Sequence, residues 1–207
     1  MLYSGKDLRK LIIPLIIEQI LAIAVGMADT IMVSAAGEAA VSGVSLVDTV
    51  NILLINVFSA LATGGAVVSG HFLGKKKRED ACKSAWQILL FATLLAFVIS
   101  VIFITAHDPL LRLMFGKIED DVMKASKTYL IITTYSFVAL AIYNSCAALF
   151  RAMNESKVTM WVSLLMNVIN VVGNAICIYG LHMGVAGVAI PTTISRYVAA
   201  VVIFLLM

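Results

Sequence analysis

LIIPLIIEQILAIAVGMADTIMV, residues 11–33, is the stretch that decides the fold class of this chain. It is continuously apolar except for a few polar positions, among them Glu18, Gln19 and Asp29. As a helix it is long enough to cross a hydrocarbon core of roughly 30 Å. A strand facing lipid would alternate apolar and polar residues, and this stretch does not. It therefore predicts a transmembrane helix.

The composition supports the same interpretation for the whole chain. Of its 207 residues, 61% are hydrophobic and only 13% are charged, whereas soluble domains carry about 25% charged residues. This balance excludes a disordered chain and a water-soluble globule, and the three cysteines form no disulfide framework. We expect an all-α polytopic membrane protein, with residues 1–207 forming a single lobe of six transmembrane helices. The predicted helices lie at about 11–33, 44–70, 85–106, 129–150, 158–179 and 185–207.

Lys and Arg residues are distributed unevenly between the two sides of the predicted spans. Ten of the fifteen fall before the first span or in the loops on the same side, including the run from Lys75 to Arg78. Because cytoplasmic loops are enriched in Lys and Arg, we expect a multi-pass protein of the cell membrane with a cytoplasmic N-terminus. No basic patch with interleaved aromatic residues is present, so nucleic acid is not an expected partner.

Two acids in the first span are the leading functional candidates. Glu18 and Asp29 are three helical turns apart and face nearly the same way. A charge at the bilayer centre costs about 2.5–3.5 kcal/mol on insertion scales, so each acid is a candidate proton-binding or cation-binding group. Pro14 removes a backbone hydrogen bond one turn before Glu18 and predicts a kink. The alternative is that each acid lies near a helix end and reaches water.

Other polar residues in the spans leave their roles open. Asn167, Asn170 and Asn174 share one helical face, where amides line a polar cavity or bond neighbouring helices together. Asp48 lies near the outer end of the second span, and we expect it to be solvated. Arg196 lies midway along the last span and needs an acid partner or a watery cleft; its partner could equally be an anionic group.

The sequence carries no motif of an enzyme. HExxH, GxSxG and P-loop patterns are absent, and the histidines and cysteines occur singly. We therefore expect no catalytic residues, no bound cofactor and no cluster of metal ligands.

Several short motifs follow one another in a fixed order along the chain. They are IPLIIEQ (13–19), MADTIMV (27–33), TGGAVVSGHFLGK (63–75), FRAMN (150–154), the stretch 167–180 and GVAGVAI (184–190). In order and spacing this set resembles the N-terminal half of a multidrug and toxic compound extrusion (MATE) transporter, and the resemblance covers essentially the whole chain. Asn174 stands where the DNA-damage-inducible branch of that family has a second acid, so the chain looks closer to the NorM-like or general bacterial branch.

The resemblance implies a function and a partner. Members have two lobes of six helices, so we expect this chain to be a fragment whose partner is the second lobe of the same transporter. The implied activity is antiport, which exports organic, often cationic, compounds in exchange for H⁺ or Na⁺. Asp29 would bind the coupling ion, and its neutralisation would let the kink at Pro14 change. The expected substrate cavity is lined by Gln19, Tyr143, Asn144, Asn170 and Asn174.

Two other functions remain open at this point. A lipid-linked precursor flippase would need a strongly cationic cavity for a diphosphate, and Arg196 is the only cation midway along a predicted span. A membrane subunit that does not itself transport is the alternative from another class. A reading frame that continues past Met207 into six more spans would favour the transporter.

Overall fold

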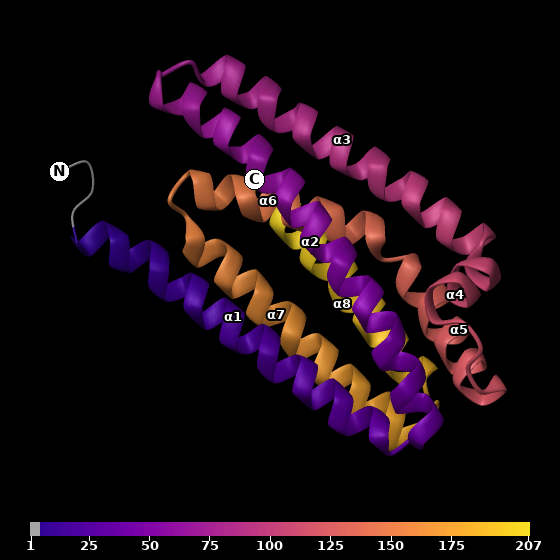
Figure 1. Cartoon of the computed structure of the whole chain (residues 1–207). Helices are drawn as coiled ribbons and strands as arrows, with labels where there is room; N and C mark the ends of the chain where they lie inside the picture. The colour runs from indigo at the N-terminus through magenta and orange to yellow at the C-terminus, as the bar shows by residue number, and fades with distance from the viewer. Residues whose placement is uncertain (1–4) are drawn as a thin grey trace.

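The computed structural model describes residues 5–207, with the side chains of Arg9 and of Leu11 onward. The described chain is helical and contains no strand, which confirms the all-α prediction (Figure 1). The elements in chain order are α1 (Gly5–Ser34), α2 (Glu38–Gly74), α3 (Arg78–Thr105), α4 (His107–Phe115), α5 (Asp120–Thr134), α6 (Phe137–Ala152), α7 (Ser156–Ala175), the π-helical turn η1 (Ile176–Gly180) and α8 (Ala186–Leu206).

Five of these helical segments are long and apolar enough to cross a membrane: α1, α2, α3, α7 continued by η1, and α8. Taken together, α5 and α6 pass the same test of length and composition as a sixth, broken span, bent by 52° at its break. The sequence predicted one uninterrupted helix over 129–150, whereas the structure starts this span at Asp120 and breaks it after Thr134. The short helix α4 was not predicted either.

The break between α5 and α6 follows from hydroxyl side chains that bond back to the backbone. Thr134 Oγ1 donates to the carbonyl of Leu130 at 2.6 Å, and Ser136 Oγ donates to that of Thr133 at 2.6 Å. Such back-bonding competes with the helical ladder and bends helices. Carbonyls beside the break are satisfied from α8, because Thr193 Oγ1 donates to Ile132 at 3.0 Å and Tyr197 OH donates to Tyr135 at 2.7 Å. The bend is therefore held in place by α8.

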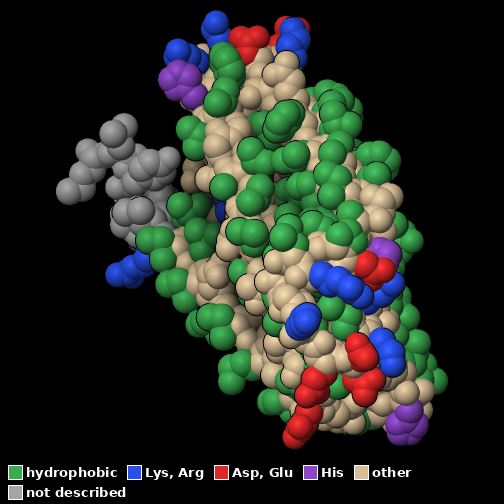
Figure 2. Space-filling model, turned by 45° about the vertical axis from the view of Figure 1, so that its right-hand side comes forward, with side chains coloured by type: hydrophobic (Ala, Val, Ile, Leu, Met, Phe, Trp, Pro, Cys, Tyr) green, Lys and Arg blue, Asp and Glu red, His purple; other side chains and the backbone are tan. Residues whose placement is uncertain are grey.

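Successive spans run in opposite directions, so that α1 and α7, which lie side by side, run in the same direction. In Figure 1, α1 lies along α7 and α3 lies along α2, while α2 also contacts α6, and α8 contacts both α6 and α7. Charged side chains gather at two opposite ends of the molecule, with an apolar band between them (Figure 2). One end, called the basic end here, carries the run Lys75–Arg78 between α2 and α3. The other end carries α4 and the start of α5.

Small residues let the helices approach closely. Ala62 and Ala66 of α2 are buried against Ala148 and Leu149 of α6. A side chain at Gly173 of α7 would place its Cβ 2.6 Å from a side-chain carbon of Pro191 in α8, closer than van der Waals contact permits. The α7–α8 contact that results is the one on which the polar site below is built.

Candidate functional site

Helix α1 turns a narrow polar stripe toward the rest of the lobe. Most of its isoleucines are exposed, whereas Pro14 and Glu18 are buried and Asp29 is half-buried. Near its end, Met32 and Val33 enter an apolar core that includes Val47 of α2 and Val188 of α8. The acids therefore lie on the face that packs against α7, and α1 continues through Pro14 as one helix.

Asp29 is the first member of a hydrogen-bonded chain that crosses three helices. Asn174 Nδ2 of α7 donates to Asp29 Oδ1 at 2.6 Å and to Asn170 Oδ1 at 3.2 Å. Asn170 Nδ2 donates in turn to Thr192 Oγ1 of α8 at 2.9 Å. The spacing of the two asparagines, one helical turn, is what lets α7 bridge α1 and α8. These four residues are called the Asp29 network below.

The Asp29 network contains an oxygen that lacks a hydrogen-bond donor. Asn174 is fully buried, and its Oδ1 has no partner among the described residues. Buried polar atoms are almost always satisfied, and this oxygen beside the Asp29 carboxylate can accept one further donor or ligand. The site offers the carboxylate of Asp29, the two amide oxygens and the Thr192 hydroxyl, which are the oxygen ligands that hard cations prefer. No group of three His, Cys, Asp or Glu side chains suited to a metal occurs in residues 5–207.

Glu18 lies in a separate cluster toward the basic end. Arg151 Nη2 at the end of α6 forms an ion pair with Glu18 Oε1 at 2.6 Å. Tyr143 OH donates to the same oxygen at 3.4 Å, and Thr159 Oγ1 of α7 donates to Oε2 at 3.3 Å. Glu18 is 8% exposed, so its charge is compensated inside the protein by Arg151. The structure thus places Tyr143 with Glu18 and not with Asp29.

The other residues expected to line a cavity take different positions. Asn144 Nδ2 donates at 3.0 Å to the carbonyl of Leu140 in its own helix. Gln19 is exposed on α1. Asn167 is buried, and its Nδ2 has no partner in the described chain. Of the five residues expected in the cavity, only Asn170 and Asn174 belong to the Asp29 network.

The position of Asp48 differs from the one that the sequence predicted. It is half-buried instead of solvated, and its Oδ1 accepts hydrogen bonds from Tyr129 OH of α5 at 3.0 Å and from Asn51 Nδ2 at 3.3 Å. The expectation was wrong because α2 extends from Glu38, so that Asp48 lies well inside the helix and against α5.

Arg196 points to the break between α5 and α6. Its Nη1 donates to Ser136 Oγ at 2.9 Å, and no carboxylate of the described chain forms an ion pair with it. Sequence reasoning missed Tyr129, Ser136 and Thr192; the only signal they gave was a hydroxyl within a span.

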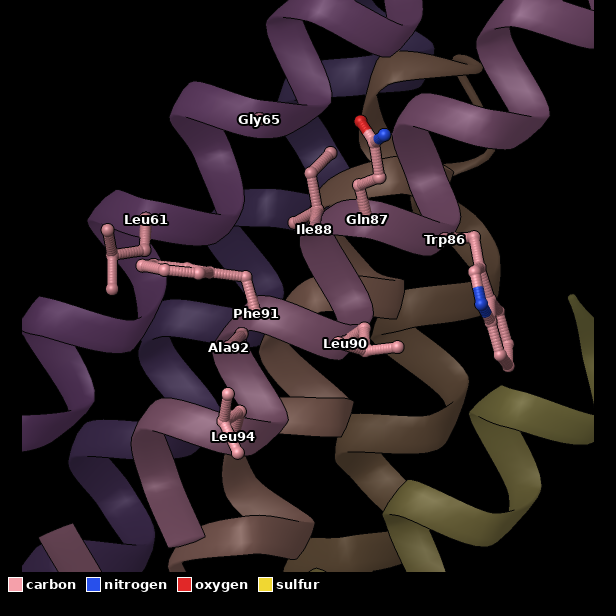
Figure 3. A pocket seen from close by; sticks show the side chains of 9 residues that line it. All are labelled: Leu61, Gly65, Trp86, Gln87, Ile88, Leu90, Phe91, Ala92 and Leu94. Atoms are coloured by element: carbon pink, nitrogen blue, oxygen red, sulfur yellow. The ribbon is translucent and has the colours of Figure 1, made fainter. Parts of the chain in front are cut away.

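A wide groove between α2 and α3 lies outside this polar interior. Leu61 and Phe91 point toward each other across it, and Trp86 lies on its outer side (Figure 3). Its nine lining residues include no charged residue and none of the Asp29 network. The groove belongs to the apolar surface of the molecule and not to the candidate site.

Six apolar spans with charged ends and a buried acid–amide network define a polytopic α-helical membrane protein with a polar interior. The MatE family model matches residues 14–176. The chain is 32% identical over 193 residues to the "Uncharacterized transporter YisQ" of Bacillus subtilis, covering 91% of this chain and 42% of that protein. It is 27% identical to the "Probable multidrug resistance protein NorM" of Thermotoga maritima, covering 94% of this chain and 42% of that protein.

Solved structures agree with these relatives. An outward-facing multidrug resistance MATE family transporter of the MOP superfamily superposes with a TM-score of 0.89 at 25% identity, over 96% of this chain and 44% of that one. A MOP superfamily transporter from Pyrococcus furiosus, described as having a binding pocket of reverse polarity, gives the same TM-score and identity. The chain therefore belongs to the MatE family, and the resemblance found in its sequence is confirmed. It spans less than half the length of the curated relatives that it matches.

Proposed function

We propose that this chain forms the ion-binding lobe of an antiporter that exports organic, often cationic, compounds in exchange for H⁺ or Na⁺. The observation that carries the proposal is the Asp29 network, which links the acid of α1 to amides of α7 and a hydroxyl of α8. Because the chain covers about 42% of its relatives, the second lobe of the same transporter is the proposed partner. The N-terminus and the basic end are proposed to face the cytoplasm.

The network offers an acceptor for a proton carried by Asp29. Ionised, Asp29 accepts from Asn174 Nδ2 and leaves Asn174 Oδ1 without a donor. Protonation would add an O–H to Asp29, which can donate to that orphan oxygen, so that acid and amide form two reciprocal hydrogen bonds. A sodium ion between Asp29, the amide oxygens and Thr192 would satisfy the same oxygen. Either ion removes the cost of a lone carboxylate inside the membrane.

Ion binding is coupled to helix α1 by the way that this helix is anchored. Besides its packing along α7, the Glu18 cluster and the apolar residues Met32 and Val33, α1 is tied to the lobe by the hydrogen bond from Asn174. Changing the charge of Asp29 changes this bond, and Pro14 supplies a position where the helix can bend because its nitrogen donates no hydrogen bond. An ion drives such a change only if it binds the two states of α1 with different affinity.

The polarity of the interior favours cationic substrates over a lipid diphosphate. Apart from the paired Glu18 and Arg151, the charged residues well inside α1, α2 and α8 are two acids, Asp29 and Asp48, and one cation, Arg196, so these three carry a formal charge of −1. The relatives named for multidrug resistance support organic compounds as the cargo of this chain too. Gln19 and Asn144 are proposed as substrate contacts that α1 and α6 present beyond the network.

The proposal is tested by efflux of a fluorescent organic cation from liposomes that contain the full-length protein. Export is driven by an imposed proton gradient or, separately, by a sodium gradient. Asp29→Asn should abolish export under whichever gradient drives the wild type, whereas Thr30→Val should retain it. Thr30 is a suitable control because it is exposed next to Asp29 and bonds only the carbonyl of Gly26 in its own helix. Unchanged export by Asp29→Asn would remove Asp29 from the mechanism.

A further inference from the structure

Helix α7 carries a buried polar stripe along most of its length. Six hydroxyl or amide residues recur there at intervals of three or four and therefore share one face. Each of them is more than nine-tenths buried. They are Ser156, Thr159, Ser163, Asn167, Asn170 and Asn174, called the α7 stripe below. No charged residue occurs from Val158 to Gly180, so these neutral groups supply the buried polarity of the span.

The α7 stripe connects the two polar clusters of α1. Near the basic end, Thr159 Oγ1 donates to Glu18 Oε2 at 3.3 Å, and Glu18 is paired with Arg151. Further along, Asn174 Nδ2 donates to Asp29 Oδ1 at 2.6 Å. In Figure 1 the turn from α6 to α7 lies at the same end of the molecule as the turn from α2 to α3, which is the basic end. The stretch from Thr159 to Asn174 rises about 22 Å as a helix, so the stripe bridges most of a hydrocarbon core.

Several polar atoms along this line have no protein partner. Six buried side-chain atoms in the described residues lack a hydrogen bond. Three of them are on the stripe, Ser156 Oγ, Asn167 Nδ2 and Asn174 Oδ1, and a fourth is Nε of Arg151, which meets the first turn of α7 through Glu18. If the stripe only bonded helices together, these atoms would be paired with neighbouring helices. Buried atoms of this kind are the usual partners of ordered water.

The spacing of the stripe suits a chain of single water molecules. Side chains three or four residues apart on a helix have Cβ atoms about 5–6 Å apart. A water that bonds each of two neighbours at about 2.8 Å spans the same distance. Asn174 and Asn170 already touch directly, at 3.2 Å. Direct and water-mediated contacts together can therefore make a continuous polar line from Asn174 to Ser156.

Helix α1 packs lightly between the two ends of this line. It is tied to the rest of the lobe at Glu18 and at Asp29. Between those two residues only Leu21, Val25 and Ala28 are partly buried, and the others are exposed. Movement of this part of α1 breaks few contacts, so it can admit water to the stripe.

We propose that the α7 stripe lines a hydrated path through which the coupling ion passes between the Asp29 network and the basic end, and that the Glu18–Arg151 ion pair closes this path. The inference rests on the proposed function and goes beyond it to the route that the ion takes. Neutral hydroxyls and amides suit a path, because they bind a cation weakly enough to release it. The ion pair suits a closure, because it ties α1 to α6 at the point where the stripe reaches the basic end.

Cysteine labelling of the full-length protein tests the path from the cytoplasmic side. The native thiols are first removed by Cys82→Ala, Cys146→Ala and Cys177→Ala. Inside-out membrane vesicles then present the cytoplasmic face to a small cationic methanethiosulfonate reagent that does not cross membranes. Ser163→Cys adds a thiol near the middle of the stripe and should be labelled. Val162→Cys is the matched control, because Val162 is equally buried but packs in the apolar cluster of α6 and α8, and it should stay unlabelled.

Breaking the ion pair tests the closure. Adding Arg151→Gln to Ser163→Cys should raise its labelling rate by about tenfold, the change in rate expected for the loss of one charged hydrogen bond. The double change Glu18→Gln with Arg151→Gln should raise the rate likewise, and it leaves no unpaired charge that could unfold the protein. Val162→Cys should stay unlabelled in both backgrounds, which separates an opened path from loosened packing.

Equal labelling of Ser163→Cys and Val162→Cys would overturn the path, as would labelling of Ser163→Cys from the outer face alone. A rate that neither Arg151→Gln nor the double change raises would overturn the closure, and so would equal increases at both positions. The proposed function itself fails if Asp29→Asn binds the coupling ion normally. If Asp29→Asn loses ion binding while Ser163→Cys stays unlabelled, only the inferred path fails.

Discussion

Asn174 Nδ2 lies 2.6 Å from Asp29 Oδ1, and this hydrogen bond joins the most exposed span of the lobe to its polar interior. The donor amide is fully buried, while the acid is half-buried on the inner face of α1. Any change in the charge of Asp29 must therefore alter the contact between α1 and α7. The predictions below test the residues on either side of this bond.

Asn174→Asp should tighten cation binding. It places a second carboxylate beside Asp29, and two neighbouring carboxylates share a cation or a proton more readily than one does. We expect sodium affinity to rise by about tenfold, or half-maximal proton uptake to move upward by about one pH unit. Asn144→Asp makes the same chemical change at a half-buried site that bonds its own helix, and it should leave ion affinity unchanged. Equal shifts in the two variants would contradict the account.

Thr192→Val should weaken the network from the α8 side. Asn170 Nδ2 donates to the Thr192 hydroxyl, so valine would leave a buried donor unsatisfied at a cost of about 1–3 kcal/mol. We expect lower ion affinity and slower export, measured in the same liposome assay. Thr105→Val is the matched control, because that exposed hydroxyl bonds only carbonyls of its own helix. Wild-type affinity in Thr192→Val would show that Thr192 is not a member of the site.

Breaking the Glu18–Arg151 pair should reduce stability more than ion affinity. Removing one partner of a buried ion pair costs about 3–5 kcal/mol, and the low end applies because the Arg151 side chain is 28% exposed. Thermal unfolding in detergent should show a clear loss for Arg151→Gln and partial recovery in the double variant Glu18→Gln with Arg151→Gln. Lys83→Gln breaks the exposed pair with Glu79 and should change little. A large loss of ion affinity without loss of stability would instead place Glu18 in the ion site.

Movement of α1 should change the fluorescence of a native tryptophan. Trp161 of α7 lines a shallow groove with Ile13, Pro14 and Ile17 of α1. With the other tryptophan removed by Trp86→Phe, we expect the emission of Trp161 to shift when the coupling ion binds. The shift should vanish in Asp29→Asn. A shift of equal size in both proteins would mean that α1 moves for a reason unrelated to Asp29.

The pH dependence of transport should not arise from the end of the molecule that carries α4 and the start of α5. Lys127 donates a hydrogen bond to Asp108, and this contact holds the pKa of that carboxyl below its usual value of 3.8. The stabilisation is complete above the unfolded pKa and is lost as pH falls through the lower folded value, so it is constant near neutral pH. Asp108→Asn should therefore leave the pH profile of export unchanged. A displaced profile would assign ion coupling to the α4–α5 region.

The sequence was sufficient to predict the helical spans, apart from the break between α5 and α6, and three of the four residues of the Asp29 network. Apolar runs and the periodicity of 3.6 residues show which residues share a face, so Asp29, Asn170 and Asn174 could be selected from the pattern alone. Thr192 could not, since a single hydroxyl in an apolar span has no periodic partner. The burial of Asp48 depends on how α2 packs on α5. The helix break depends on the hydroxyls of Thr134 and Ser136, which donate to carbonyls of the preceding turn, and on Tyr197 of α8, which donates to a carbonyl at the break. These are tertiary relationships.

The most direct test of the account is competition between the coupling ion and a radioactive organic cation for the purified full-length protein. Raising the concentration of the coupling ion, H⁺ or Na⁺, should displace the organic cation from the wild type. The same titration should displace none from Asp29→Asn, because the ion has lost the carboxylate through which it acts. Equal displacement from both proteins would contradict the claim that the coupling ion binds at Asp29.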